Sequence, residues 1–155
     1  MKYLIYGVIF ALTLFKDGYS NEIDIKKIED NHNTYYKHLF ENDMDSLAKL
    51  FSFPSLFKGF VNEVQIAKNE ADIKIIYQNL IKAAPQSKFA SGGRNYTEIN
   101  TSVESKTIFK MREDTYLLIV KYTQSDKRDN SVIFSGSASY LFTKKDSKWL
   151  ISGVF

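Results

Sequence analysis

The sequence predicts a single α+β domain in which helices come first and a curved antiparallel sheet follows. Before Pro85, apolar residues recur with the helical period of about 3.6 residues, and after it they alternate with the period of two that is typical of strands. The later strand-like segments are joined by short charged turns, as in an antiparallel meander. The chain has 155 residues, of which 44% are hydrophobic, so one core is expected.

Residues 1–20 have the layout of a secretory signal peptide. After a positively charged start, residues 4–15 form an uncharged apolar run, and Gly18 and Ser20 are small residues at the expected cleavage position. A helix of this length rises about 18 Å, which is short for a hydrocarbon core of about 30 Å. We expect cleavage after Ser20 and a mature domain over residues 21–155, with an uncleaved N-terminal anchor as the alternative.

The cysteine content and the charge limit the class of protein. The chain has no cysteine, which excludes disulfides and a lipid attached to cysteine. An exported chain without disulfides depends on its core alone, so we expect a secreted or periplasmic protein of bacterial type. The formal net charge is only +3, and basic residues are mixed with acids. We therefore expect no nucleic-acid partner and, after signal cleavage, no membrane attachment.

Three helices are expected in the first half of the mature chain. The first covers about residues 22–41, where apolar and aromatic residues recur at helical spacing. Asp43 is expected to cap a second, short helix that reaches Phe51 and is stopped by Pro54. A third helix opens near Asn69. Two short extended segments between the second and third helices could form a hairpin.

Four strands are expected in the second half of the chain. They cover roughly residues 95–111, 115–124, 131–143 and 148–155. Long strands twist, so the helices must cover the concave face of the sheet to bury it. Trp149 lies in the last strand and is expected in the core.

Two segments carry a resemblance to a known family. From Tyr35 to Phe51 and from Tyr140 to Ile151, the chain resembles the NTF2-like superfamily, and within it the SnoaL-like and ketosteroid-isomerase-like branch. The resemblance implies a cone in which three N-terminal helices pack on a curved antiparallel sheet. Members of the superfamily use the enclosed pocket for small molecules or peptides, many are not enzymes, and many dimerise through the sheet.

The resemblance does not extend to the catalytic carboxylates of the isomerase branch. It implies that Tyr35 occupies the position of the oxyanion donor, whereas the two carboxylate positions fall near Gly59 and Gly136. Proton transfer next to a carbonyl needs a base within hydrogen-bond reach. We therefore expect an exported non-catalytic domain that binds a small apolar ligand or a protein partner, with a homodimer through the sheet as one form.

Two alternatives remain open at the level of sequence. One is a SnoaL-like enzyme of the isomerase, cyclase or hydrolase type that uses Tyr35 as a hydrogen-bond donor. The other is a structural or interaction subunit whose cone is filled by its own side chains. The candidate pocket residues are five tyrosines: Tyr35, Tyr36, Tyr77, Tyr116 and Tyr140. Small residues over 135–139 are expected to leave room above the sheet for a ligand or a packed helix.

No cofactor or metal is expected. His32 and His38 lie six positions apart, which places them on different faces of a helix, so they cannot bind one metal together. Each is expected at the surface or at the edge of the core.

Overall fold

The computed structural model describes residues 22–58, 63–83 and 98–155. The predicted signal peptide, the Gly59 position and the segment around Pro85 lie outside these residues. A first helix covers residues 22–40. The elements that follow are α2 (Met44–Ala48), β1 (Phe51–Phe57), β2 (Gln65–Ala67), α3 (Glu70–Ala83), β3 (Ile99–Arg112), β4 (Thr115–Asp126), β5 (Val132–Lys145) and β6 (Lys148–Val154).

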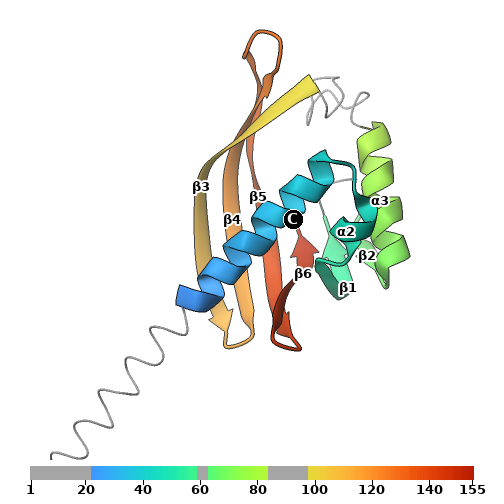
Figure 1. Ribbon diagram of the computed structural model, residues 1–155, viewed down its shortest axis with the longest axis vertical. Coiled ribbons are helices and arrows are strands. Elements are labelled where there is room, and N and C mark those ends of the chain that lie inside the picture. Colours follow the sequence, from blue (N-terminus) through green and yellow to red (C-terminus); the bar gives the residue numbers. More distant parts are fainter. Residues whose placement is uncertain (1–21, 59–62, 84–97) are drawn as a thin grey trace, which may run out of the picture.

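The strands form one curved sheet in the order β2-β1-β6-β5-β4-β3. The four strands β3 to β6 pair antiparallel in chain order, as predicted. β1 joins the sheet parallel to β6, and β2 pairs antiparallel with β1. The first helix crosses the concave face of the sheet, while α2 and α3 lie beside β1 and β2 (Figure 1). Among the described residues, no helix has both the length and the hydropathy that crossing a membrane requires.

The second helix is shorter than predicted. α2 ends at Ala48, and Phe51 begins β1, so Pro54 lies inside a strand instead of stopping a helix. A short apolar run fits the helical period and the strand period equally well. Here pairing with β6 makes the segment a strand, because Phe51 is the register partner of Ile151. The Ile151 N–H also donates to the Leu50 carbonyl at 2.9 Å. Pro54 has no N–H to donate to the hydrogen bonds between the strands. It lies where the register of β1 against β6 shifts, between Phe51 and Leu56.

The first helix packs on the sheet through one face. Ile28, His32 and Tyr35 are buried along it at intervals of four and three residues, the spacing of one helical stripe. They join a core that includes Tyr140, Phe142, Trp149 and Ile151 from the sheet and Ile73 and Tyr77 from α3. The prediction that the helices cover the concave face is therefore confirmed.

Polar contacts around Trp149 attach this helix to the last strand. The indole Nε1 of Trp149 donates to the Asp24 carboxylate at 2.9 Å, and the Asn31 side-chain amide donates to the Trp149 carbonyl at 2.7 Å. The Lys144 ammonium lies 3.3 Å from the same carboxylate and 5.3 Å from the centre of the indole ring. Trp149 is buried, as predicted.

We expect Asp24→Ala to destabilise the domain by about 2–3 kcal/mol, because it leaves a buried indole N–H without its acceptor. Asp24→Asn keeps an acceptor oxygen and should cost less. Asp30→Ala, at an exposed position of the same helix, is the matched control and should change little. Urea unfolding followed by the fluorescence of the single tryptophan measures all three. Equal stabilities of the Asp24→Ala and Asp30→Ala variants would contradict the role of Asp24.

Candidate functional site

Three of the five candidate tyrosines contact His32 in the centre of the fold, and a fourth, Tyr77, joins them through Tyr35. Tyr35 and Tyr36 come from the first helix, Tyr77 from α3 and Tyr140 from β5. The His32 ring lies edge-on to Tyr36 and Tyr140, with centroids 4.8 and 4.7 Å apart, and stacks on Tyr35 at 6.2 Å. We call these five residues the aromatic cluster.

The hydroxyls of the aromatic cluster bond to one another. Tyr77 donates its hydroxyl to Tyr35 at 3.0 Å, and the Tyr36 and Tyr140 hydroxyls lie 3.1 Å apart. Burial raises the pKa values of Tyr35 and Tyr140 well above the ordinary value for a phenol. Both phenols are therefore neutral at physiological pH and act as hydrogen-bonding groups.

Aromatic side chains fill the centre of the cone. Phe51 and Phe57 of β1 pack on Tyr77 with ring centroids 6.0 and 5.9 Å away. Tyr35, Tyr77, Tyr140 and both phenylalanines are each at most 3% exposed. Such packing leaves these tyrosines in contact with protein on all sides. In this part of the fold, the structure agrees with the alternative in which the cone is filled by its own side chains.

Tyr116 does not belong to the aromatic cluster. It is buried at another part of the sheet, where its ring packs edge-on against Trp149 with centroids 5.1 Å apart. The structure thus separates this candidate from the other four. Ligand binding by any of the five tyrosines stays a prediction.

The expectation for His32 was wrong, since its side chain is fully buried. Within the described residues, neither ring nitrogen has a hydrogen-bond partner. Burial first, and then the nearby charge of Lys106, lower the pKa of His32 from 6.5 to about 3, so the ring is neutral. The sequence held a signal for this position, because His32 follows Ile28 by four residues and precedes Tyr35 by three, on the apolar stripe of the helix.

His38 lies apart from His32, at the end of the first helix. Its Nδ1 is 3.4 Å from the Asp43 carboxylate, which is ion-pair range but outside hydrogen-bond geometry. Asp43 accepts from the Ser46 N–H at 3.0 Å, so it caps α2 as predicted. Hydrogen bonding to the Ser46 side chain first, and then to its N–H, lowers the pKa of the Asp43 carboxyl group. Within the described ranges, no group of histidines and carboxylates could hold a metal ion.

No carboxylate is among the causes of the pKa shifts of His32, Tyr35, Tyr36 and Tyr140. Burial, neighbouring phenols and the Lys106 ammonium account for these four shifts. Gly136, at the second carboxylate position implied by the resemblance, lies in β5 with the Phe134 ring folded over it. The first of these positions, near Gly59, lies outside the described residues. Acid–base chemistry by a pair of carboxylates therefore has no support here.

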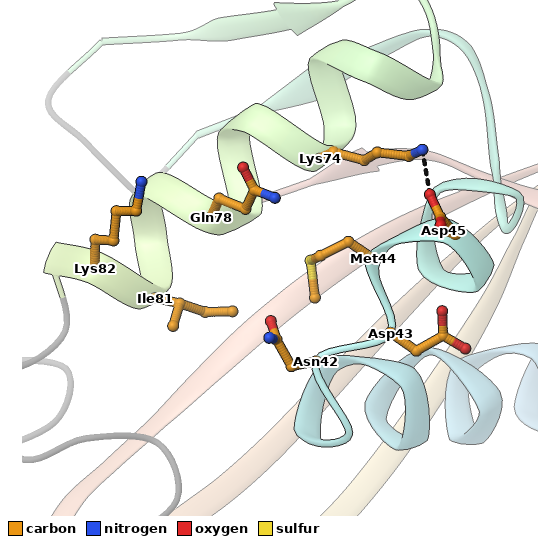
Figure 2. A pocket seen from close by; sticks show the side chains of 8 residues that line it. All are labelled: Asn42, Asp43, Met44, Asp45, Lys74, Gln78, Ile81 and Lys82. Atoms are coloured by element: carbon orange, nitrogen blue, oxygen red, sulfur yellow. Dashed lines mark ion pairs between the residues drawn. The ribbon is translucent and has the colours of Figure 1, made fainter.

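A second candidate site is a polar cleft of about 530 Å³ between the turn before α2 and the side of α3 that faces this turn (Figure 2). Met44 and Ile81 supply its apolar surface, and Lys74 pairs with Asp45 at one end. The remaining lining residues are Asn42, Asp43, Gln78 and Lys82. The two lysines and two aspartates balance in charge, so the cleft favours neither a cation nor an anion.

Comparison with known proteins gives the name of the fold. No protein-family model and no protein of curated function matches the sequence. A solved protein of unknown function with a cystatin-like fold from Nostoc punctiforme superposes with a TM-score of 0.65 at 15% identity, over 85% of this chain and 88% of that chain. An NTF2-like protein with a cystatin-like fold from Novosphingobium aromaticivorans superposes with a TM-score of 0.57 at 12% identity, over 83% and 77%.

The chain has the NTF2-like fold. A third solved structure with this arrangement is the association domain of CaMKII from C. elegans, with a TM-score of 0.60 at 11% identity, over 87% of this chain and 95% of that chain. Identities this low establish the α+β architecture, with helices packed on a curved sheet, and nothing about activity.

We expect the hydroxyl bond between Tyr35 and Tyr77 to appear as an energetic coupling. Tyr35→Phe and Tyr77→Phe should each cost about 1–2 kcal/mol, and the double variant should cost about 1 kcal/mol less than their sum. Urea unfolding of the four proteins gives the coupling energy. A cycle of Tyr35→Phe with Tyr116→Phe, whose ring packs on Trp149, is the control and should be additive. Additivity in both cycles would contradict the bond.

We expect buried, neutral His32 to make stability depend on pH. Because the pKa of His32 is lower in the folded chain, below about pH 6.5 the imidazole binds a proton in the unfolded chain but not in the folded one. The contribution of His32 to the free energy of unfolding is therefore constant above that pH and is lost as the pH falls toward 3. Between about pH 6 and pH 4, the natural chain should lose about 1.4 kcal/mol per pH unit more than His32→Phe does. Parallel stability curves from urea unfolding would contradict the buried imidazole.

Proposed function

We propose that this chain is an exported, non-catalytic domain that assembles with a second copy of itself through the outer face of its sheet. The outer face is the convex side, turned away from the first helix. The observation that carries the proposal is a single apolar row across all six strands of this face. The filled centre of the cone and the missing carboxylates support a role in assembly over catalysis.

The apolar row follows the register of the sheet from one edge to the other. Each of its members is the Cα partner of the next, and every one is apolar: Ile66, Leu56, Gly153, Leu141, Leu117 and Phe109. A shift in register between β5 and β6 brings Gly153 to this face instead of the core side. Five strand spacings make the row about 24 Å long.

Phe155 completes the row where glycine interrupts it. A Cβ atom at Gly153 would lie 2.8 Å from the Phe155 ring, so this ring occupies the space above the glycine. The backbone of Phe155 pairs with Ser139 of β5 through two hydrogen bonds of 2.8 Å, which hold the residue at the sheet. Phe155 and Phe109 are 44% and 47% exposed, so two large rings on this face remain open to solvent.

The surroundings of the row have the composition of an interface rim. On the same face, Lys121 pairs with Ser137, and Thr123 pairs with Ser135. The Thr123 hydroxyl bonds to both Ser135 and Glu104. An apolar strip bordered by satisfied polar groups is the usual layout of a protein interface. The row is long enough to form the centre of one of ordinary size, about 800 Å² per partner.

Two further considerations favour a second copy as the occupant. A row that crosses the whole sheet presents the same apolar strip to a twofold-related copy, so the surface is self-complementary about an axis through its middle. One solved structure with this fold is described as an association domain, which is a statement about that protein and only supports the proposal for this one.

The test is the mass of the mature chain in solution, measured by sedimentation. We expect a dimer for the natural chain, and for Phe109→Lys and Leu117→Lys an association at least about thirtyfold weaker, because each removes an apolar anchor and buries a charge. Ile75→Lys on α3, where isoleucine is 56% exposed, is the matched control and should stay dimeric. A monomeric natural chain, or dimers in all variants, would refute the proposal.

A further inference from the structure

We infer that the polar cleft between α3 and the turn before α2 is a binding site for a neutral pyranose sugar. Its volume of about 530 Å³ falls within the range of about 300–1,000 Å³ that small-molecule sites have. All of its lining residues come from α3, the first turn of α2 and the turn before it (Figure 2). None of them lies in the sheet, so the site is separate from the assembly proposed for the outer face.

One side of α3 forms the first wall of the cleft. Lys74, Gln78, Ile81 and Lys82 follow one another at intervals of four, three and one residues, which places them along one stripe of the helix. From the first to the last of them the helix rises about 12 Å. Met44 on the opposite wall and Ile81 point toward one another (Figure 2). Because Met44 is only 8% exposed, these two side chains make an apolar floor below the polar groups.

The turn before α2 forms the second wall, and its backbone is held by the first helix. The Asn42 N–H donates to the Leu39 carbonyl at 3.2 Å, and the Asp43 N–H donates to the His38 carbonyl at 2.9 Å. Asn42 itself has a φ of 56°, in the left-handed region that often ends a helix. Its exposed side chain points across the cleft toward α3 (Figure 2). A wall that is already fixed costs little to order when a ligand binds.

The polar groups of the cleft match the hydroxyl groups of a sugar. The exposed carboxamides of Asn42 and Gln78 each offer a donor and an acceptor from opposite walls. The two lysines of the cleft add donors, and its two aspartates add acceptors. Each hydroxyl of a pyranose both donates and accepts, so it needs such a mixture. The C–H groups on the face of the ring are apolar and fit the floor.

The charges of the cleft select a neutral ligand. Asp45 forms an ion pair with Lys74, and Asp43 already accepts a hydrogen bond from the Ser46 N–H. A charged ligand would therefore have to compete with a partner that is in place. Lys82 is exposed, and water and salt screen an exposed charge, so it adds little affinity for an anion. A neutral ring needs only the remaining hydrogen-bonding capacity of the side chains.

The test is a titration of the mature chain with the methyl glycosides of glucose, galactose, mannose and N-acetylglucosamine. Binding is followed by NMR of the methionine methyl groups, because Met44 lines the cleft and Met111 lies in β3, where it is 59% exposed. We expect at least one glycoside to shift the Met44 signal saturably and to leave the Met111 signal in place. Glucuronate and protonated glucosamine, which carry a charge on the same kind of ring, should bind no more tightly.

Variants of the two carboxamides test which side chains hold the sugar. Gln78→Ala and Asn42→Gly should each weaken binding about threefold to tenfold, as expected for one lost hydrogen bond. Both variants should fold, because alanine suits an exposed helical position and glycine accepts the positive φ of Asn42. Asn79→Ala removes the same group from the neighbouring exposed position of α3, outside the cleft, and should leave the affinity unchanged.

The mass in solution should be the same for all three variants, which separates this site from the assembly on the outer face. The inference is overturned if none of the four neutral glycosides shifts the Met44 signal saturably, or if a charged sugar binds more than about tenfold more tightly than every neutral one. It is also overturned if Gln78→Ala and Asn42→Gly both bind undiminished, or if Asn79→Ala weakens binding as much as they do.

Discussion

The hydrogen bond between the Trp149 indole and the Asp24 carboxylate is the constraint on which the rest of the structure depends. It joins the first turn of the first helix to the closing strand, and Asn31 repeats the attachment two turns later. With two turns of the helix both bonded to Trp149 of β6, the rotation of the helix is set, and so is the stripe that it presents to the sheet. Ile28, His32 and Tyr35 must then point into the cone. The depth at which the aromatic cluster forms is a consequence of this attachment.

The sheet separates two kinds of surface because its side chains alternate. On the inner side, phenol hydroxyls are buried but bond to one another, so the polar atoms stay satisfied while the rings supply apolar contact. On the outer side, the apolar row has no covering element among the described residues. A single layer of strands must bury one face on its own helices, and the other face then needs either polar residues or a partner. The outer face of this chain carries a polar strip and an apolar strip side by side.

Much of the fold could be predicted from the sequence, because the signals concerned are local. The change of period near Pro85, the Asp43 cap and the buried Trp149 each depend on residues close in the chain. The α2–β1 boundary could not be predicted, because Phe51 fits a helical stripe and only its pairing with Ile151 makes it a strand residue. The apolar row was beyond prediction for the same reason. Its members come from six strands, and a shift in register places Gly153 among them.

The candidate site shows where local reasoning weakens. Grouping the tyrosines by type put Tyr116 with Tyr35, although the two rings sit at different parts of the inner face. The prediction for His32 relied on the usual exposure of histidine and overlooked that His32 lies on the apolar stripe of the first helix, between Ile28 and Tyr35. A fully buried, neutral imidazole whose ring nitrogens have no partner among the described residues is costly for the folded chain. Its ring nevertheless packs edge-on against Tyr36 and Tyr140, so His32 is part of the core of the cone, and its cost grows as the pH falls because the unfolded chain takes up the proton.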